Sequence, residues 1–356
     1  MPRLLDIAIV PSSEWPALDQ AAWTAALADG GFFGDGGALA RYPVTRQAVM
    51  RTAYARWLGH LRQTNGRATT LSGLDACHDR RIVGAFLERL RAVAPCTARA
   101  YLTDLLTVCR AMAPGDTFPL IHAAARHAWH TAKPVTDKLA RMVPARDLYR
   151  LGFELMEHAP GLSTPLKRAS CFQDGLMIAM LTACPVRLGN FIAIEIDRHL
   201  VHDGLTYRLH FTAPEVKNRR PLELPLPAEL TSAIDTWINN YRRGCLSRRG
   251  RWHRGGANAQ LWVSEGGNAF SRGYRVRQRI ERCTEARFGR RINPHLFRDI
   301  AATSIATEIP EQVGIIRSVL GHANMTTGER FYNQARSVHA SQAYQATLDR
   351  FRLTAA

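Results

Sequence analysis

The stretch that decides the fold is residues 293–333, which begins NPHLFRDIAAT and, after a connector, continues SVLGHANMTTGERFYN. Asn293 is a favourable helix N-cap and Pro294 suits the first helical position, so a helix is predicted to begin here. This helix carries His295 and Arg298 on one face, because residues three apart are neighbours on a helix surface. An imidazole and a guanidinium are therefore expected to face the same space.

Two more short helices are predicted downstream of this one. The first covers residues 310–320, and Gly321 after it can take the left-handed conformation that turns the chain and delivers His322. The next helix begins near Thr326, which starts a Thr-x-x-Glu capping box, and it holds Tyr332 in its first two turns. Two histidines, an arginine and a tyrosine are therefore expected to lie near one another.

The overall charge favours a polyanionic partner. The 356 residues contain 47 Lys and Arg against 30 Asp and Glu, a net charge of +17, and the apolar fraction of 46% excludes a disordered chain. Ribosomal and membrane-surface proteins are also basic, so charge alone does not choose between partners. No apolar run has the length of a signal segment or a membrane span, so a soluble cytoplasmic protein without membrane contact is expected.

The N-terminal part reads as an extension followed by a helical bundle. Residues 1–42 contain one short helix and a glycine-rich break, and they form either an arm that contacts DNA or a neighbour, or a segment packed on the first domain. Residues 43–131 contain four amphipathic helices, which begin near Val44, Asp79, Thr97 and Asp116 or Thr117. Such helices joined by short loops predict a compact bundle.

The C-terminal part has a different pattern. A Pro-containing linker is predicted at 132–144, a second domain at 145–336 and a terminal helix at 337–356. The second domain is predicted to begin with helices at 145–158 and 165–183, and later helices are predicted at 229–241 and 271–288. Between them alternating apolar residues predict three strands, at 191–196, 205–211 and 222–226. The fold class is therefore mainly α with a small antiparallel β-sheet (α+β).

Arginines supply the candidate DNA contacts, and the alternative for each is a solvated surface. The candidates lie on the first bundle helix, in the turn before the last strand and in a basic glycine-containing loop: Arg46, Arg51, Arg219, Arg220, Arg248, Arg249, Arg251 and Arg254. Three histidines on one predicted helix have no Cys or carboxylate near them in sequence, so no metal site is expected there: His122, His127 and His130.

The C-terminal motifs resemble the tyrosine recombinase (phage integrase) family. The likeness rests on its HxxR box at His295 and Arg298, its LGH box ending at His322 and its nucleophile at Tyr332, ten residues later. Any one motif occurs by chance in many chains, whereas the three in this order are specific. The resemblance spans about residues 187–332 and implies that residues 145–336 are the catalytic domain. Residues 43–131 would be the family's core-binding, DNA-binding domain, with which they agree only in architecture.

The resemblance implies a set of catalytic residues and an activity. Tyr332 would attack a DNA phosphodiester and form a 3′-phosphotyrosyl intermediate, which conserves bond energy so that neither ATP nor a metal is needed. In this scheme Arg187 and Arg298 clamp the phosphate with help from His322. Histidine 295 assists proton transfer from the nucleophile, and Lys217 protonates the departing 5′ oxygen. The implied catalytic residues are therefore Arg187, Lys217, His295, Arg298, His322 and Tyr332.

Two positions depart from the family pattern. The family usually has an acidic residue three positions after its first arginine, where this chain has Asn190. It commonly has a histidine directly after the second arginine, where this chain has Asp299. Both positions are expected to tune the support of the arginines rather than to supply the reaction.

The implied function is site-specific recombination or integration of DNA, of the kind that serves phages and mobile elements. The partners would be a double-stranded recombination site and further copies of this chain, as a tetramer on paired sites and a monomer or dimer when free. One alternative is a type IB topoisomerase-like enzyme, which shares the chemistry but acts as a monomer. The other is a DNA-binding integrase relative without catalysis.

Overall fold

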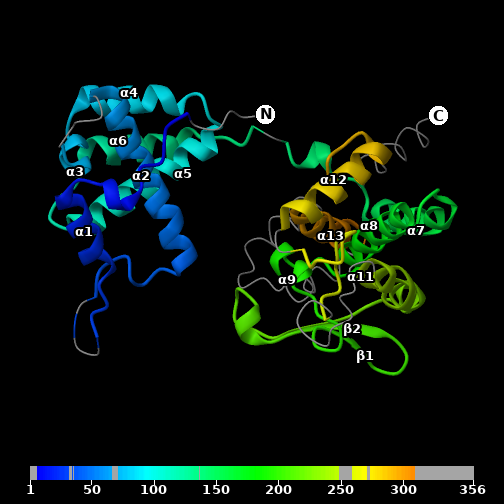
Figure 1. The fold of residues 1–356 in the computed structure, drawn as a ribbon. Helices are drawn as coiled ribbons and strands as arrows, with labels where there is room; N and C mark the ends of the chain where they lie inside the picture. Colours follow the sequence, from blue (N-terminus) through cyan, green and yellow to red (C-terminus); the bar gives the residue numbers. More distant parts are fainter. Residues whose placement is uncertain are drawn as a thin grey trace, which may run out of the picture. The chain divides into compact units, whose positions relative to one another are not determined.

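The chain divides into two compact units, Met1–Asp137 and Lys138–Ala356 (Figure 1). The computed structural model describes residues 6–31, 34, 36–65, 71–135, 137–247, 259–270 and 273–308. The division between the units falls inside the stretch 132–144, where the sequence predicts a linker.

The described part of the first unit is helical. Its α-helices are α1 (Ala17–Leu27), α2 (Val44–Asn65), α3 (Gly73–Ala76), α4 (Arg80–Leu90), α5 (Pro95–Met112) and α6 (Pro119–Thr131), and a short 3₁₀ turn, η1 (Ser12–Glu14), precedes them. The four helices that the sequence predicts are α2, α4, α5 and α6. The predicted start at Thr97 is wrong, because Pro95 takes the first helical position of α5.

Large aromatic side chains form the core of the first unit. Tyr54, Trp57, Phe86 and Phe118 are at most 1% exposed. The indole of Trp57 donates a hydrogen bond to Gly73 O at 2.7 Å, so its one polar group is satisfied although it is buried. The apolar faces of α2 and α4 therefore meet in one core, as their periodicity predicts.

The segment before α2 packs against this core. Trp15 and Trp23 are buried, and their rings lie 5.6 Å apart in an edge-to-face arrangement. The fully buried carboxylate of Asp19 accepts hydrogen bonds from Ser72 Oγ and from Gly73 N, the latter at 2.8 Å. Of the two alternatives for residues 1–42, the described residues therefore adopt the packed one.

The second unit combines helices with a small sheet. Its elements are η2 (Leu139–Arg141), α7 (Ala145–His158), η3 (Ala159–Gly161), α8 (Pro165–Ala183), α9 (Leu188–Ile192), β1 (Leu200–His202), β2 (Tyr207–Phe211), η4 (Ala213–Glu215), β3 (Leu222–Pro225), η5 (Ala228–Leu230), α10 (Thr231–Thr236), a π-helical segment η6 (Trp237–Arg242), α11 (Arg243–Ser247), α12 (Gly273–Phe288) and α13 (Pro294–Glu308).

Helix α8 lies at the centre of this unit, beside α7 (Figure 1). The hydroxyl of Thr164 accepts a hydrogen bond from Lys167 N at 3.2 Å and Pro165 occupies the first turn, so the helix begins where the sequence predicts. Every residue from Phe172 to Leu181 is buried. Most of this run is apolar, as a helix buried on all sides requires. Its two polar residues have partners, because Gln173 Nε2 donates to Val263 O at 2.9 Å and Asp174 forms an ion pair with Arg279.

The three strands form one antiparallel sheet in the order β1-β2-β3. The register pairs Leu200 with Leu209, and Leu209 with Leu224. Along β2 the residues alternate between buried and half-buried, so one face of the sheet is turned to the core. The predicted strands at 205–211 and 222–226 are confirmed as β2 and β3.

The predicted strand at 191–196 is wrong. Residues Leu188–Ile192 form α9, and β1 begins only at Leu200. Phe191 and Ile194 are fully buried and three residues apart, which puts them on one side of a helical turn but on opposite faces of a strand. A short apolar run cannot be assigned from its periodicity alone, and here tertiary packing decides for the helix.

The expected fold class, mainly α with a small antiparallel sheet, is confirmed. Within the described ranges, no helix combines the length and the apolar character that a bilayer span requires.

Two glycines allow α7 and α8 to approach closely. A Cβ on Gly175 would lie 2.4 Å from Gly152 O and 2.9 Å from Met156 Cγ, well inside van der Waals contact. We therefore expect Gly175→Ala to lower the free energy of unfolding by about 1–3 kcal/mol, because overpacking forces the helices apart. Chemical denaturation of the purified protein measures this change.

The matched control is Gly244→Ala on α11, in the same unit. A Cβ there would meet no atom within 4 Å, so the same substitution should leave stability unchanged or raise it by up to about 1 kcal/mol. Equal effects at Gly175 and Gly244 would contradict the close-packing explanation.

Candidate active site

Arg187 lies at the turn that joins α8 to α9. Helix α8 ends at Ala183, and Arg187 is the N-cap residue of α9 with an extended backbone, φ −63° and ψ 142°. Its carbonyl oxygen accepts a hydrogen bond from Phe191 N at 2.9 Å, and its side chain is half-buried. The residue therefore has the predicted place, after the central helix and before the sheet.

Arg298 and His295 lie on α13, the helix predicted from the Asn-Pro sequence. Asn293 Oδ1 accepts a hydrogen bond from Leu296 N at 3.1 Å, so the asparagine caps the helix as expected. Leu296 and Phe297 are buried and hold the helix against the core, while His295 is exposed. The predicted start of the helix is confirmed.

The guanidinium of Arg298 is buried against the α8–α9 turn. The residue is 6% exposed, and Nη1 donates a hydrogen bond to Pro185 O at 2.6 Å. Burial, together with the nearby charge of Arg187, lowers the pKa of Arg298 to about 10, although the Asp299 carboxylate offsets part of their effect. Arg298 therefore stays charged at neutral pH, and its guanidinium lies against the turn that carries Arg187.

Asp299, one of the two departures from the family pattern, forms an ion pair at the beginning of the unit. Its Oδ2 lies 3.0 Å from Lys138 Nζ, and the aspartate side chain is 17% exposed. The carboxylate thus supports the charged form of Arg298 and also contacts the residue with which the second unit begins.

Lys217 lies on the connection between β2 and β3 and is exposed. Val216 beside it is 4% exposed, and Arg219 N donates to Val216 O at 2.8 Å. This bond closes a tight turn in which Arg219 has a positive φ of 52°. The lysine therefore lies at the tip of a turn that the buried side chain of Val216 anchors in the core.

Glu215 anchors this connection. Its Oε2 accepts hydrogen bonds from Thr212 N at 2.9 Å and Thr212 Oγ1 at 2.8 Å, and its Oε1 accepts from Arg198 and from His199 Nε2 at 3.0 Å. The hydrogen bond from His199, followed by those from Thr212, lowers the pKa of Glu215 to about 2. The carboxylate is therefore ionised at every working pH.

Asn190, the second departure from the family pattern, joins α9 to the segment between β2 and β3. Its Nδ2 donates to Glu215 O at 3.0 Å. The Asn190 side chain thus joins α9, which follows Arg187, to the turn that carries Lys217. An ionised Asp or Glu at this position could not donate this hydrogen bond. Sequence reasoning missed Glu215, although Thr212 and Glu215 have the capping-box spacing that marks such an anchor.

The remaining predicted residues are distributed as follows. His322 and Tyr332 lie outside the described residues, as do four of the candidate DNA-contact arginines, Arg248, Arg249, Arg251 and Arg254. Arg51, Arg219 and Arg220 are exposed. Both terminal nitrogens of Arg46 donate to the buried Asp104, so this arginine has a partner within its own unit. The DNA contacts remain predictions.

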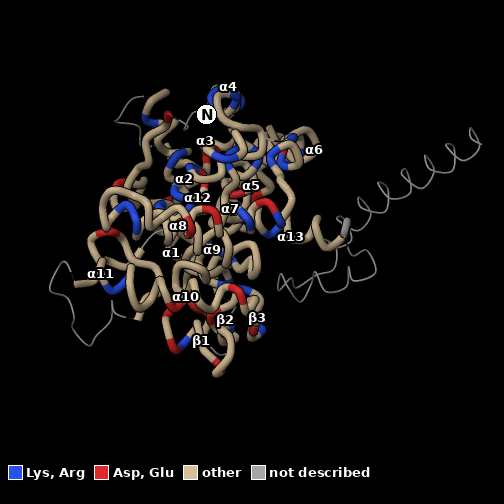
Figure 2. Tube along the Cα trace, turned by 90° about the vertical axis from the view of Figure 1, so that its right-hand side faces the viewer, with Lys and Arg blue, Asp and Glu red and all other residues tan. Residues whose placement is uncertain are grey.

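Lysine and arginine residues occur along the traces of both units (Figure 2). No three His, Cys, Asp or Glu side chains in the described part of the chain are arranged to hold a metal ion.

Comparison with known proteins identifies the fold. No protein-family model matches the sequence, and neither does the sequence of any curated protein. The structure is similar to that of the XerH site-specific recombinase bound to its difH substrate, with 15% identity, a TM-score of 0.56, and 96% of this chain and 99% of that chain covered. It is also similar to a lambda integrase dimer bound to a COC′ core site, with 16% identity, a TM-score of 0.52, and 83% and 91% covered. The chain therefore has the tyrosine-recombinase fold.

The low pKa of Glu215 makes the stability of its connection depend on pH. Because the folded-state pKa of about 2 lies below the ordinary value of 4.5, the stabilisation is complete above 4.5 and is lost as the pH falls toward 2. We expect the difference in unfolding free energy between the native protein and Glu215→Gln to shrink between about pH 6 and about pH 3. Urea denaturation at the two pH values measures it, and a constant difference would contradict the assignment.

Proposed function

We propose that this protein is a site-specific DNA recombinase, which cuts and rejoins DNA through a 3′-phosphotyrosine bond to Tyr332. The observation that carries the proposal is the convergence of Arg187 and Arg298. Arg187 is half-buried next to α9 and Arg298 is buried on α13. Arg298 Nη1 donates to Pro185 O, two residues before Arg187, and the charge of Arg187 contributes to the lowered pKa of Arg298. Two such charges held together favour a doubly bound anionic group such as a phosphodiester.

The described residues support the positions that the chemistry requires. The two arginines would stabilise the charge that develops on the nonbridging oxygens, and His295 lies one helical turn from Arg298 on its exposed side. Lys217 is an exposed ammonium on a turn that is tied to α9 through Asn190, and it would donate the proton that the 5′ oxygen needs. His322 and Tyr332 complete the set as sequence-based assignments.

The structures of XerH and lambda integrase contain DNA, and the second is a dimer. We extend both features to this chain as part of the proposal. The partner is a double-stranded recombination site, and several copies of the chain assemble on paired sites. The net charge of +17 favours such a partner, and the site of action is the DNA of the cytoplasm.

The direct test is capture of the covalent intermediate. Duplex sites are selected from a randomised pool by binding and are then nicked beside the bound centre, so that the short 5′ product diffuses away. We expect the native protein to form an adduct that survives denaturing electrophoresis, and Tyr332→Phe to form none, because the phenol oxygen is the nucleophile.

The matched control is Tyr274→Phe, which removes a hydroxyl from a tyrosine that is 64% exposed on α12. It should form the adduct at the native rate. If the native protein binds DNA but forms no adduct, the result supports a non-catalytic DNA-binding protein instead. If the native protein relaxes supercoiled DNA without exchanging strands, the result supports a topoisomerase.

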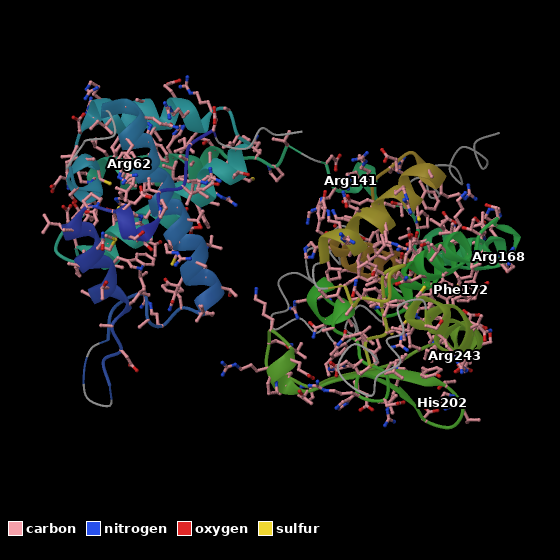
Figure 3. The ribbon with its side chains drawn as sticks, in the orientation of Figure 1. Arg62, Arg141, Arg168, Phe172, His202 and Arg243 are labelled. Carbon is pink, nitrogen blue, oxygen red and sulfur yellow. The ribbon has the colours of Figure 1, made fainter. Side chains whose placement is uncertain are left out.

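A second test addresses the arginine pair. We expect Arg187→Ala to slow adduct formation by about 10²–10³-fold, which is the usual effect of removing one donor to a developing oxyanion. Arg168→Ala is the control, because Arg168 lies in the first turn of α8, at the other end of the helix that leads to Arg187 (Figure 3). Equal losses in the two variants would indicate a general effect of charge on DNA binding.

A further inference from the structure

The Glu215 side chain, in the segment between β2 and β3, has more hydrogen-bond partners than a capping box alone requires. One oxygen binds the backbone and the hydroxyl of Thr212, and the other binds Arg198 and His199. His199 is 4% exposed, and its Nδ1 accepts a hydrogen bond from Glu195 N at 3.0 Å, so Nε2 must carry the proton that it donates to Glu215. The carboxylate is thus fixed from the strand side and from the turn side.

This fixed carboxylate lies two residues before Lys217. Val216, between them, is buried, and its carbonyl closes the turn with Arg219 N. The backbone carbonyl of Glu215 is held in addition by Asn190 from α9. The side chain of Lys217 is exposed and flexible, but the backbone from which it extends is attached to the same helix that follows Arg187.

We infer that Glu215 and Asn190 are positioning residues for Lys217, and that together they set the reach of the ammonium toward the phosphate held at Arg187. This inference rests on the proposed function. Neither residue touches the reacting atoms. Their contribution is to the proton transfer to the leaving group and not to the stabilisation of the phosphate.

The chemistry separates these two contributions. In the cleavage step the Tyr332 oxygen bonds to phosphorus, the phenolic proton passes to the base, and the bond from phosphorus to the 5′ oxygen breaks while Lys217 transfers a proton to that oxygen. If sulfur replaces the bridging 5′ oxygen, the leaving group is a thiolate, which is stable without a proton at neutral pH. A residue that acts only through Lys217 is then no longer needed.

The experiment compares adduct formation on an ordinary nicked duplex and on the same duplex with a 5′-bridging phosphorothiolate. A glutamine has one acceptor oxygen, whereas the carboxylate of Glu215 has two. In Glu215→Gln, either Thr212 or the pair Arg198 and His199 therefore loses its hydrogen-bond acceptor. We expect Glu215→Gln and Asn190→Ala to slow the reaction of the oxygen substrate by about 10- to 100-fold, as small misplacements of a reacting group do. Both variants should react with the sulfur substrate at the native rate, as should Lys217→Ala.

Two further variants calibrate the comparison. Arg187→Ala should be slow on both substrates, because phosphate stabilisation is needed whatever the leaving group. Glu223→Gln removes a carboxylate from β3 of the same sheet, 57% exposed and 3.2 Å from Arg208 Nε, and it should be native-like on both. It controls for charge on the hairpin.

The outcomes distinguish the two levels of the argument. Loss of rate on both substrates in Glu215→Gln and Asn190→Ala, or no loss on the oxygen substrate, overturns the positioning role while the recombinase proposal stands. Absence of any adduct from the native protein on either substrate overturns the recombinase proposal itself. Because the two variants act through different atoms, a folding defect in one leaves the other as the test.

Discussion

The site depends on the burial of one guanidinium. Arg298 extends from α13 into the space beneath the α8–α9 turn and donates to Pro185 O, a residue 113 positions earlier in the chain. Burying a charged group is unfavourable unless its hydrogen bonds are satisfied, and a second arginine nearby increases that cost. In the proposed function, an anion bound to both arginines would offset part of this cost.

The contacts around this guanidinium extend to the sheet. The Asp299 carboxylate offsets part of the positive charge at Arg298 and forms an ion pair with Lys138. Asn190 joins α9 to the turn that carries Lys217 through its hydrogen bond to Glu215 O. The two departures from the family pattern thus have physical roles in this chain. One is electrostatic, because it supports a buried cation, and the other is geometric, because an amide can donate where a carboxylate cannot.

Much of this architecture could be predicted from local signals. Thr164 with Pro165, and Asn293 with Pro294, mark helix starts whose causes lie within a few residues, so α8 and α13 begin where the sequence predicts. The strand predicted at 191–196 failed because burial from distant residues decides between helix and strand there. The anchoring of Glu215 by His199 and Asn190 depends on contacts across 16 and 25 positions, which no local pattern contains. The hydrogen bonds between Thr212 and Glu215 are local, and the capping-box spacing of these two residues could have predicted them from the sequence.

The contact between Gly152 and Gly175 also bears on the order in which the second unit assembles. Helices α7 and α8 are neighbours in sequence, so their pairing closes a short loop, whereas the pairing of Arg298 with Pro185 closes a long one. We expect the helical hairpin to form early and the arginine pair to meet late. On the ribosome, a nascent chain would therefore carry a folded α7–α8 hairpin before α13 emerges and Arg298 can reach Pro185 O. Under the proposed function, the arginine pair could then bind nucleic acid only after α13 has been synthesised.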